Sequence, residues 1–175
     1  MSYLAREQEL DKVIVFLIQA LTTQEPYPRV VITHSLRVGL YLEQQRHPLP
    51  VVLAGLLHDV VEDSPIPLAT IAEEFGEEVA SLVAANTVDP SLDPLERPVE
   101  SYQRCKQLGK PALLIKAADI LDNVQHYLGD SKPELRGWLS QTLQTFLALS
   151  APELANEPVW QSLRDQHQAL VESLS

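Results

Sequence analysis

Prolines divide this chain into segments, and this division constrains its fold more than any other feature of the sequence. Three pairs stand in the first half of the chain: Pro26 and Pro28, Pro48 and Pro50, and Pro65 and Pro67. Between the breaks, apolar residues recur at the three- and four-residue spacing of a helix, and no segment alternates convincingly like a strand. The sequence therefore predicts an all-α fold.

The spacing of apolar residues also predicts where the helices lie. We expect them at about residues 4–21, 30–45, 51–62, 68–75, 77–86, 99–108, 111–128, 133–149 and 158–174. Apolar residues make up 45% of the chain but aromatic residues only 6%, so the core must be mostly aliphatic. A length of 175 residues suits one domain, and we expect a single compact multi-helix bundle over residues 1–175.

Charge and cysteine content exclude several classes of protein. The net charge of −11 repels a nucleic-acid backbone, and no basic patch offsets it, so we expect no nucleic-acid partner. The single cysteine, Cys105, excludes an internal disulfide and a cysteine-based zinc site. No uncharged apolar run reaches about 18 residues, and the first residues lack a signal peptide. We therefore expect no membrane span and a cytoplasmic location.

The segment LAGLLHDVVED, residues 53–63, places four ionisable side chains directly after an apolar run. If it continues as one helix, His58 and Glu62 share one face, and Asp59 and Asp63 share the adjacent face. Carboxylates buried without a compensating positive charge are costly, and three together repel one another. One interpretation is a bound divalent cation, for which His and Asp are suitable ligands. The alternative is a helix end whose acids point into water.

Basic residues that could balance these acids are missing nearby, because the sequence has no Lys or Arg between Arg46 and Arg97. Two further ligand-type residues lie in apolar helical runs. His34 lies in the first, where a hydrogen-bonded core histidine is the alternative interpretation. Asp119 lies in the second, where the alternative is an internal ion pair with Lys116, three residues earlier, or a cap-like hydrogen bond.

Three apolar helices thus carry ligand-type residues in the order His, His-Asp, Asp, and in this order the chain resembles the HD superfamily of metal-dependent phosphohydrolases. The resemblance is closer to the hydrolase domain of RelA/SpoT-type proteins and their small stand-alone relatives, which cleave the alarmone (p)ppGpp. The matching stretches are HSLRVGLYL from His34, LAGLLHDVVEDSPIPLATIAEEFGEEVASLV from Leu53, and LLIKAADILDNV from Leu113. They span over half of the chain.

This resemblance implies an enzyme that removes the 3′-pyrophosphate from a (p)ppGpp-like nucleotide. The implied metal ligands are His34, His58, Asp59 and Asp119, and the implied catalytic acids are Glu62 and Asp63. The expected substrate contacts are Asn123, Lys116 and Arg104. The implied cofactor is one divalent metal ion, manganese in this branch, with iron, zinc or magnesium as alternatives.

The number of metal ions and the exact substrate depend on other positions. No His occurs between His58 and Asp119, where dinuclear HD phosphodiesterases, by the same resemblance, need extra ligands, so we expect a single ion. Tyr27 lies too far from His34 for the family's PYxxH spacing, and Gln125 stands where the family has a base. Two alternatives therefore stay open: an HD hydrolase of another phosphorylated metabolite, such as a nucleoside monophosphate, and a non-catalytic nucleotide- or metal-binding protein. The expected partner is a small phosphorylated nucleotide, and a homodimer is left open.

Overall fold

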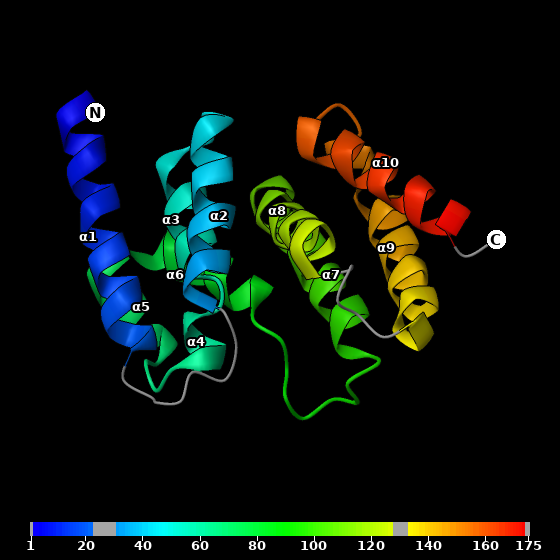
Figure 1. Cartoon of the computed structure of the whole chain (residues 1–175). Coiled ribbons are helices and arrows are strands. Elements are labelled where there is room, and N and C mark those ends of the chain that lie inside the picture. The colour runs from blue at the N-terminus through cyan, green and yellow to red at the C-terminus, as the bar shows by residue number, and fades with distance from the viewer. Residues whose placement is uncertain (1, 23–30, 128–132, 174–175) are drawn as a thin grey trace. The chain divides into compact units, whose positions relative to one another are not determined.

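A computed structural model of the chain describes residues 2–22, 31–127 and 133–173 (Figure 1). These residues form helices joined by turns and loops, with no strand among them, so the all-α prediction is confirmed. The chain forms two compact units, which we call unit 1 (Met1–Thr87) and unit 2 (Val88–Ser175). Tyr27, which bears on the substrate prediction, lies outside the described residues.

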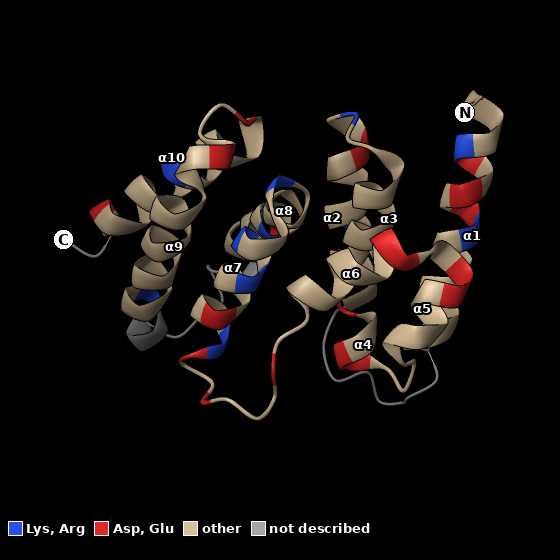
Figure 2. Ribbon diagram, turned by 180° about the vertical axis from the view of Figure 1, so that it is seen from behind, with Lys and Arg blue, Asp and Glu red and all other residues tan. Residues whose placement is uncertain are grey.

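Unit 1 is built around a short, uncharged helix. Its helices are α1 (Tyr3–Leu21), α2 (Val31–Gln44), α3 (Leu49–Leu57), α4 (Val60–Asp63), α5 (Leu68–Phe75) and α6 (Glu77–Asn86). Helix α3 packs against α1, α2 and α6, and its residues from Val51 to Leu57 are all buried. It holds no charged residue, so it is tan throughout in Figure 2. Pro50 fits its first turn, where the missing backbone N–H has no helical partner to lose.

Helices α2 and α3 cross closely because each has a glycine at the contact. A Cβ atom added to Gly39 would lie 2.3 Å from Leu56 Cγ. One added to Gly55 would lie 2.4 Å from Leu42 Cδ1 and 3.6 Å from the Gly39 Cα atom. Only glycine allows the two backbones to approach this far without displacing the leucines.

The predicted helix 51–62 is interrupted, and the prediction of one continuous helix is wrong at this point. Helix α3 ends at Leu57 and α4 begins at Val60, with His58 and Asp59 in the turn between them. The His58 ring donates a hydrogen bond to the Gly55 carbonyl, and such side-chain bonds compete with the backbone ladder.

Unit 2 contains α7 (Arg97–Leu108), α8 (Lys110–Tyr127), α9 (Pro133–Leu154) and α10 (Pro158–Ser173). Helix α8 packs against the other three. Gly109 joins α7 to α8 with φ +103°, a backbone conformation that favours glycine. Helix α9 runs past Pro152, beyond the predicted end near residue 149, and its last residue, Leu154, is fully buried. Burial of Leu154 offsets the hydrogen bond that the proline removes.

No helix in the described ranges has both the length and the apolar character needed to cross a membrane.

Candidate metal centre and active site

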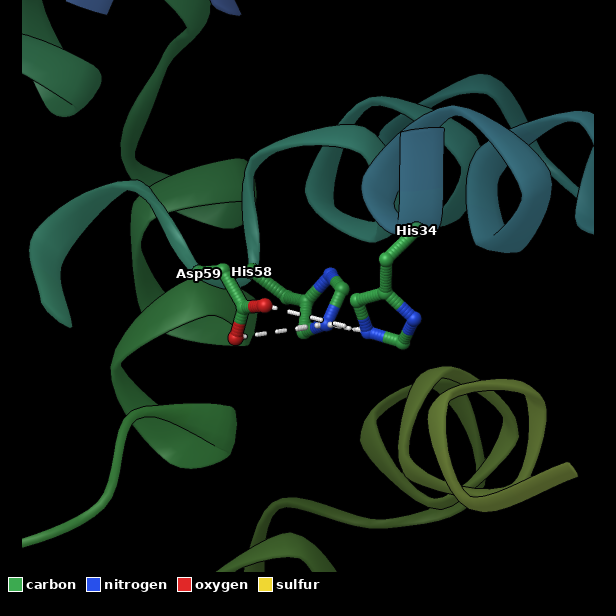
Figure 3. Close-up of side chains that lie close together, drawn as sticks. All are labelled: His34, His58 and Asp59. Atoms are coloured by element: carbon green, nitrogen blue, oxygen red, sulfur yellow. Dashed lines mark hydrogen bonds and ion pairs between the residues drawn. The ribbon is translucent and has the colours of Figure 1, made fainter. Parts of the chain in front are cut away.

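Unit 1 brings together three of the four predicted metal ligands: His34 on α2, and His58 and Asp59 in the turn after α3 (Figure 3). The Nε2 atoms of the two imidazoles lie 3.2 Å apart. Asp59 reaches both rings, with Oδ2 at 3.7 Å from His34 Nε2 and Oδ1 at 3.4 Å from His58 Nε2. Their exposed fractions are only 4%, 1% and 6%. We call these three residues the triad.

The hydrogen bond of His58 fixes which of its nitrogens can bind a metal. His58 Nδ1 lies 2.8 Å from the Gly55 carbonyl oxygen, which can only accept, so Nδ1 carries the proton. In the neutral ring Nε2 then presents its lone pair toward His34 and Asp59. Histidines that bind metals usually donate their other ring N–H to such an acceptor.

The donor set of the triad fits a divalent ion. Donors bound at about 2.1 Å to one ion lie roughly 3 to 3.5 Å apart, depending on the coordination angle. The separations within the triad, 3.2 to 3.7 Å, are close to this range. Two imidazoles and a carboxylate suit zinc, iron or manganese. The triad is therefore a chemically suitable cation site built from unit 1 alone.

The predicted catalytic acids follow the triad directly in the chain. Glu62 and Asp63 form the end of α4, and their backbone N–H groups donate to the Asp59 carbonyl oxygen at 3.1 and 2.9 Å. The Glu62 side chain is exposed, whereas Asp63 is half-buried. The main chain therefore links both acids to a predicted metal ligand.

The fourth predicted ligand, Asp119, lies on α8 in unit 2, where two neighbours hold its carboxylate. Lys116 Nζ lies 3.1 Å from Oδ2, and the Asn123 amide donates to Oδ1 at 2.6 Å. The ion pair that the sequence offered as an alternative is thus present. Burial alone would lower the pKa of the Lys116 ammonium. The charge and hydrogen bond of Asp119, together with the nearby Cys105 and Tyr102, outweigh burial and keep that pKa above its ordinary value.

A cavity of about 380 Å³ within unit 2 includes these three side chains in its wall. The rest of the wall is mostly apolar, and its further residues with polar atoms are Ser101, Tyr102, Trp138 and Thr142. Burial raises the pKa of Tyr102 to about 12, so its phenol is neutral near pH 7. Arg104, a predicted phosphate contact, is outside the residues lining this cavity, and its Nε lies 2.7 Å from Glu100 Oε1.

Sequence reasoning missed the supporting residues of the site. Gly55 supplies both the close helix crossing and the carbonyl that orients His58, and Tyr102 contributes to the cavity wall. The signal for Gly55 was available: a glycine three residues before a histidine, within a buried helix. Tyr102 has no comparable signal, because α7 is otherwise a polar helix with few buried residues.

Comparison with known proteins gives a family match. A family described as HD domain matches residues 15–154 of this chain. Guanosine-3′,5′-bis(diphosphate) 3′-pyrophosphohydrolase MESH1 of Danio rerio is 31% identical over 153 residues, which cover 86% of this chain and 80% of the fish protein. The Homo sapiens protein of the same name is 31% identical over 130 residues, covering 73% and 71%.

Longer proteins match over a smaller share of their length. The bifunctional (p)ppGpp synthase/hydrolase SpoT of Escherichia coli is 30% identical over 139 residues, 75% of this chain but 19% of SpoT. Among solved structures, a metazoan SpoT orthologue described as hydrolysing ppGpp has a TM-score of 0.74 and 22% identity, covering 94% of this chain and 95% of that one. The protein lmo0812 of Listeria monocytogenes has a TM-score of 0.69 and 26% identity, covering 79% and 99%.

Proposed function

This chain belongs to the HD-domain family, and we propose that it is a metal-dependent phosphohydrolase that removes the 3′-pyrophosphate from a (p)ppGpp-like guanosine nucleotide. The resemblance to the HD superfamily is thereby confirmed. The observation that carries the proposal is the triad, because its two imidazoles and one carboxylate lie buried within ligand distance of one another. The names of the relatives support the choice of substrate.

We propose that His34, His58 and Asp59 hold one divalent ion, with Asp119 of unit 2 as the fourth ligand and manganese as the first candidate metal. The family match supports a single HD-type domain, because residues 15–154 include parts of both units. The chemistry that such an ion supplies is polarisation of a phosphoryl oxygen and activation of water near neutral pH.

The acids of α4 would move the protons of the reaction. The oxygen of a water molecule attacks the phosphorus atom that is bonded to the 3′-oxygen. The bond between this phosphorus and the 3′-oxygen breaks, and pyrophosphate is released. In this proposal the carboxylates of Glu62 and Asp63 take up a proton from the attacking water and return one to the 3′-oxygen. Two carboxylates in different surroundings suit the separate roles of proton acceptor and proton donor. Glu62 is exposed, whereas Asp63 is half-buried.

Substrate contacts are proposed on the other unit. The Asn123 side chain is exposed and lies on the face of α8 that carries Asp119, which suits a contact with the nucleotide. Arg104 on α7 is a candidate for a phosphate contact, because its guanidinium is partly exposed. Lys116 is a candidate for the same kind of contact from its sequence position, but its buried ion pair with Asp119 points to a different role.

One assay tests the proposed function. The purified full chain, loaded with Mn²⁺, is given (p)ppGpp and a panel of other nucleotides, and released pyrophosphate and phosphate are measured separately. We expect pyrophosphate from (p)ppGpp. Release of phosphate from another nucleotide would support the alternative, an HD hydrolase of a different phosphorylated metabolite. Metal binding without any turnover would show that the chain is not an enzyme for these nucleotides.

The metal stoichiometry is tested independently by elemental analysis of the purified chain after dialysis against Mn²⁺. We expect one ion per chain, because the donor atoms in unit 1 converge on one point. Two ions per chain at full occupancy would contradict the mononuclear proposal.

A further inference from the structure

Lys116 is a buried cation that takes no part in the proposed proton transfers. Its side chain is only 7% exposed, and it lies on α8 one turn before Asp119. Burying an ammonium group is costly unless an anion pairs with it. The observed partner is Asp119, whose Oδ2 lies 3.1 Å from Lys116 Nζ.

Asp119 is the only acid among the described residues that line the cavity, and Lys116 is the only base. The other polar groups of that wall are hydroxyls, an amide and an indole, which are neutral near pH 7. Within unit 2 the two side chains therefore form a charge-balanced pair at the edge of a mostly apolar space. The Asn123 amide holds the remaining oxygen, Oδ1, at 2.6 Å.

A side chain held in this way is poorly placed to contact a phosphate. To reach a substrate, the ammonium would have to leave the carboxylate, and both groups would then lose their pairing in a buried place. A metal ion that binds Asp119, in contrast, brings a second positive charge to the same carboxylate. At short range and in a poorly solvated place, repulsion between the ammonium and the ion is substantial.

Resting on the proposed function, in which Asp119 is a metal ligand, we infer that Lys116 is an internal counterion: it neutralises Asp119 while no metal is bound, and it thereby weakens metal binding at that carboxylate. Lys116 acts through Asp119 and is a positioning residue, not a catalytic one. The pair makes the metal-free chain stable without an ion and keeps the metal exchangeable.

The test compares two variants of the full chain, stripped of metal and titrated with Mn²⁺ alone by isothermal calorimetry. Lys116→Met removes the charge and keeps an unbranched side chain, and we expect Mn²⁺ to bind roughly tenfold more tightly, the change that one pKa unit of interaction produces. Lys116→Arg keeps the charge and should bind Mn²⁺ as the natural chain does. Unchanged or weaker binding by Lys116→Met overturns the inference, as does tighter binding by both variants.

The variant Asp119→Asn separates this inference from the proposed function. We expect it to bind Mn²⁺ more weakly, and we expect Lys116→Met to tighten binding less in combination with it than in the natural chain, because the ammonium then has no carboxylate ligand to neutralise. If Asp119→Asn binds Mn²⁺ normally, the proposed ligand set fails and takes the inference with it. If Asp119→Asn weakens binding but Lys116→Met does not tighten it, only the counterion inference fails.

Folding of the neutral variant is followed by circular dichroism. Should Lys116→Met be unfolded without metal, Mn²⁺ is added during refolding and the helical signal is measured again. Recovery of the signal supports the inference, because the ion then takes the place of the lost ammonium. Failure to recover overturns it.

Discussion

Asp59 in unit 1 and Asp119 in unit 2 are both poorly exposed aspartates, but their surroundings differ. Asp59 lies against two imidazoles, at 3.4 and 3.7 Å, in a stretch of sequence without Lys or Arg from residue 47 to residue 96. Asp119 lies against an ammonium that α8 itself supplies, at 3.1 Å. A neutral imidazole offers a lone pair or an N–H, whereas an ammonium offers a full charge.

The difference shows two ways in which a fold can keep a carboxylate out of water. In unit 2 the chain itself provides a compensating positive charge beside the carboxylate, the Lys116 ammonium. In unit 1 the chain provides donor atoms that converge, and a divalent ion would supply the charge. An aspartate therefore forms part of an internal ion pair in unit 2 and part of a candidate metal site in unit 1.

The largest effect on turnover is expected from removing a ligand of the triad. Asp59→Ala should lose Mn²⁺ binding and lower turnover by about a thousandfold or more, because the ion and its activated water depend on the ligands. The free energy of unfolding of the metal-free chain should not fall, since a poorly solvated carboxylate is removed. Elemental analysis, kinetics and urea denaturation measure the three quantities. Retention of a full equivalent of Mn²⁺ would show that Asp59 is not a ligand.

A second variant separates chemistry from metal binding in unit 1. Glu62→Ala should keep the metal and lower kcat by about a hundredfold to ten-thousandfold, the range that general acid–base groups contribute. Glu73→Ala is the matched control, because Glu73 is an exposed acid on α5 with no assigned role, and it should have normal kcat. Normal turnover by Glu62→Ala would exclude that residue from the reaction.

The comparison predicts the opposite stability effect in unit 2. Asp119→Ala leaves the Lys116 ammonium buried without its carboxylate, so the metal-free chain should lose about 3 kcal/mol of unfolding free energy. Urea denaturation of metal-free protein measures this loss beside that of Asp59→Ala. Equal losses in the two variants would mean that the two aspartates are not held differently.

The smallest effect concerns the helix crossing that supports the triad. Gly39→Ala should lower the free energy of unfolding by about 1–3 kcal/mol, because its Cβ would meet the Leu56 side chain. Gly137→Ala in α9 is the control: a Cβ there meets nothing within 4 Å, so this change should be neutral or slightly stabilising. Thermal unfolding of both variants checks the difference, and an equal response would mean that the crossing tolerates a larger side chain.

Most of the fold could be predicted from the sequence, because proline breaks and apolar spacing act locally. The predicted ranges 68–75 and 77–86 coincide with α5 and α6. The errors have two causes, tertiary packing in one helix and a local side-chain hydrogen bond in the other. Helix α9 continues through Pro152 because Leu154 is buried, and the helix after Pro50 stops at Leu57, where His58 bonds back to Gly55.

The candidate site was predictable to a different degree in each unit. His34, His58 and Asp59 stood out because ionisable residues in apolar runs need compensation, and the structure brings the three together. For Asp119 the sequence offered both a ligand and an ion pair with Lys116, and spacing alone could not distinguish them, because residues three apart on a helix always meet. Nothing local identifies the partners that come from other helices, such as Tyr102 in the cavity wall.

The carbonyl oxygen of Asp59 accepts hydrogen bonds from the backbone amides of both Glu62 and Asp63. A four-residue helix has almost no stability of its own. The hydrogen bonds of α4 therefore break readily when Asp59, the residue that accepts them, moves. Anchoring the Asp59 side chain would therefore slow the exchange of those two amide hydrogens with solvent deuterium. A metal ion bound at the triad would in this way also restrict the motion of the Glu62 and Asp63 carboxylates.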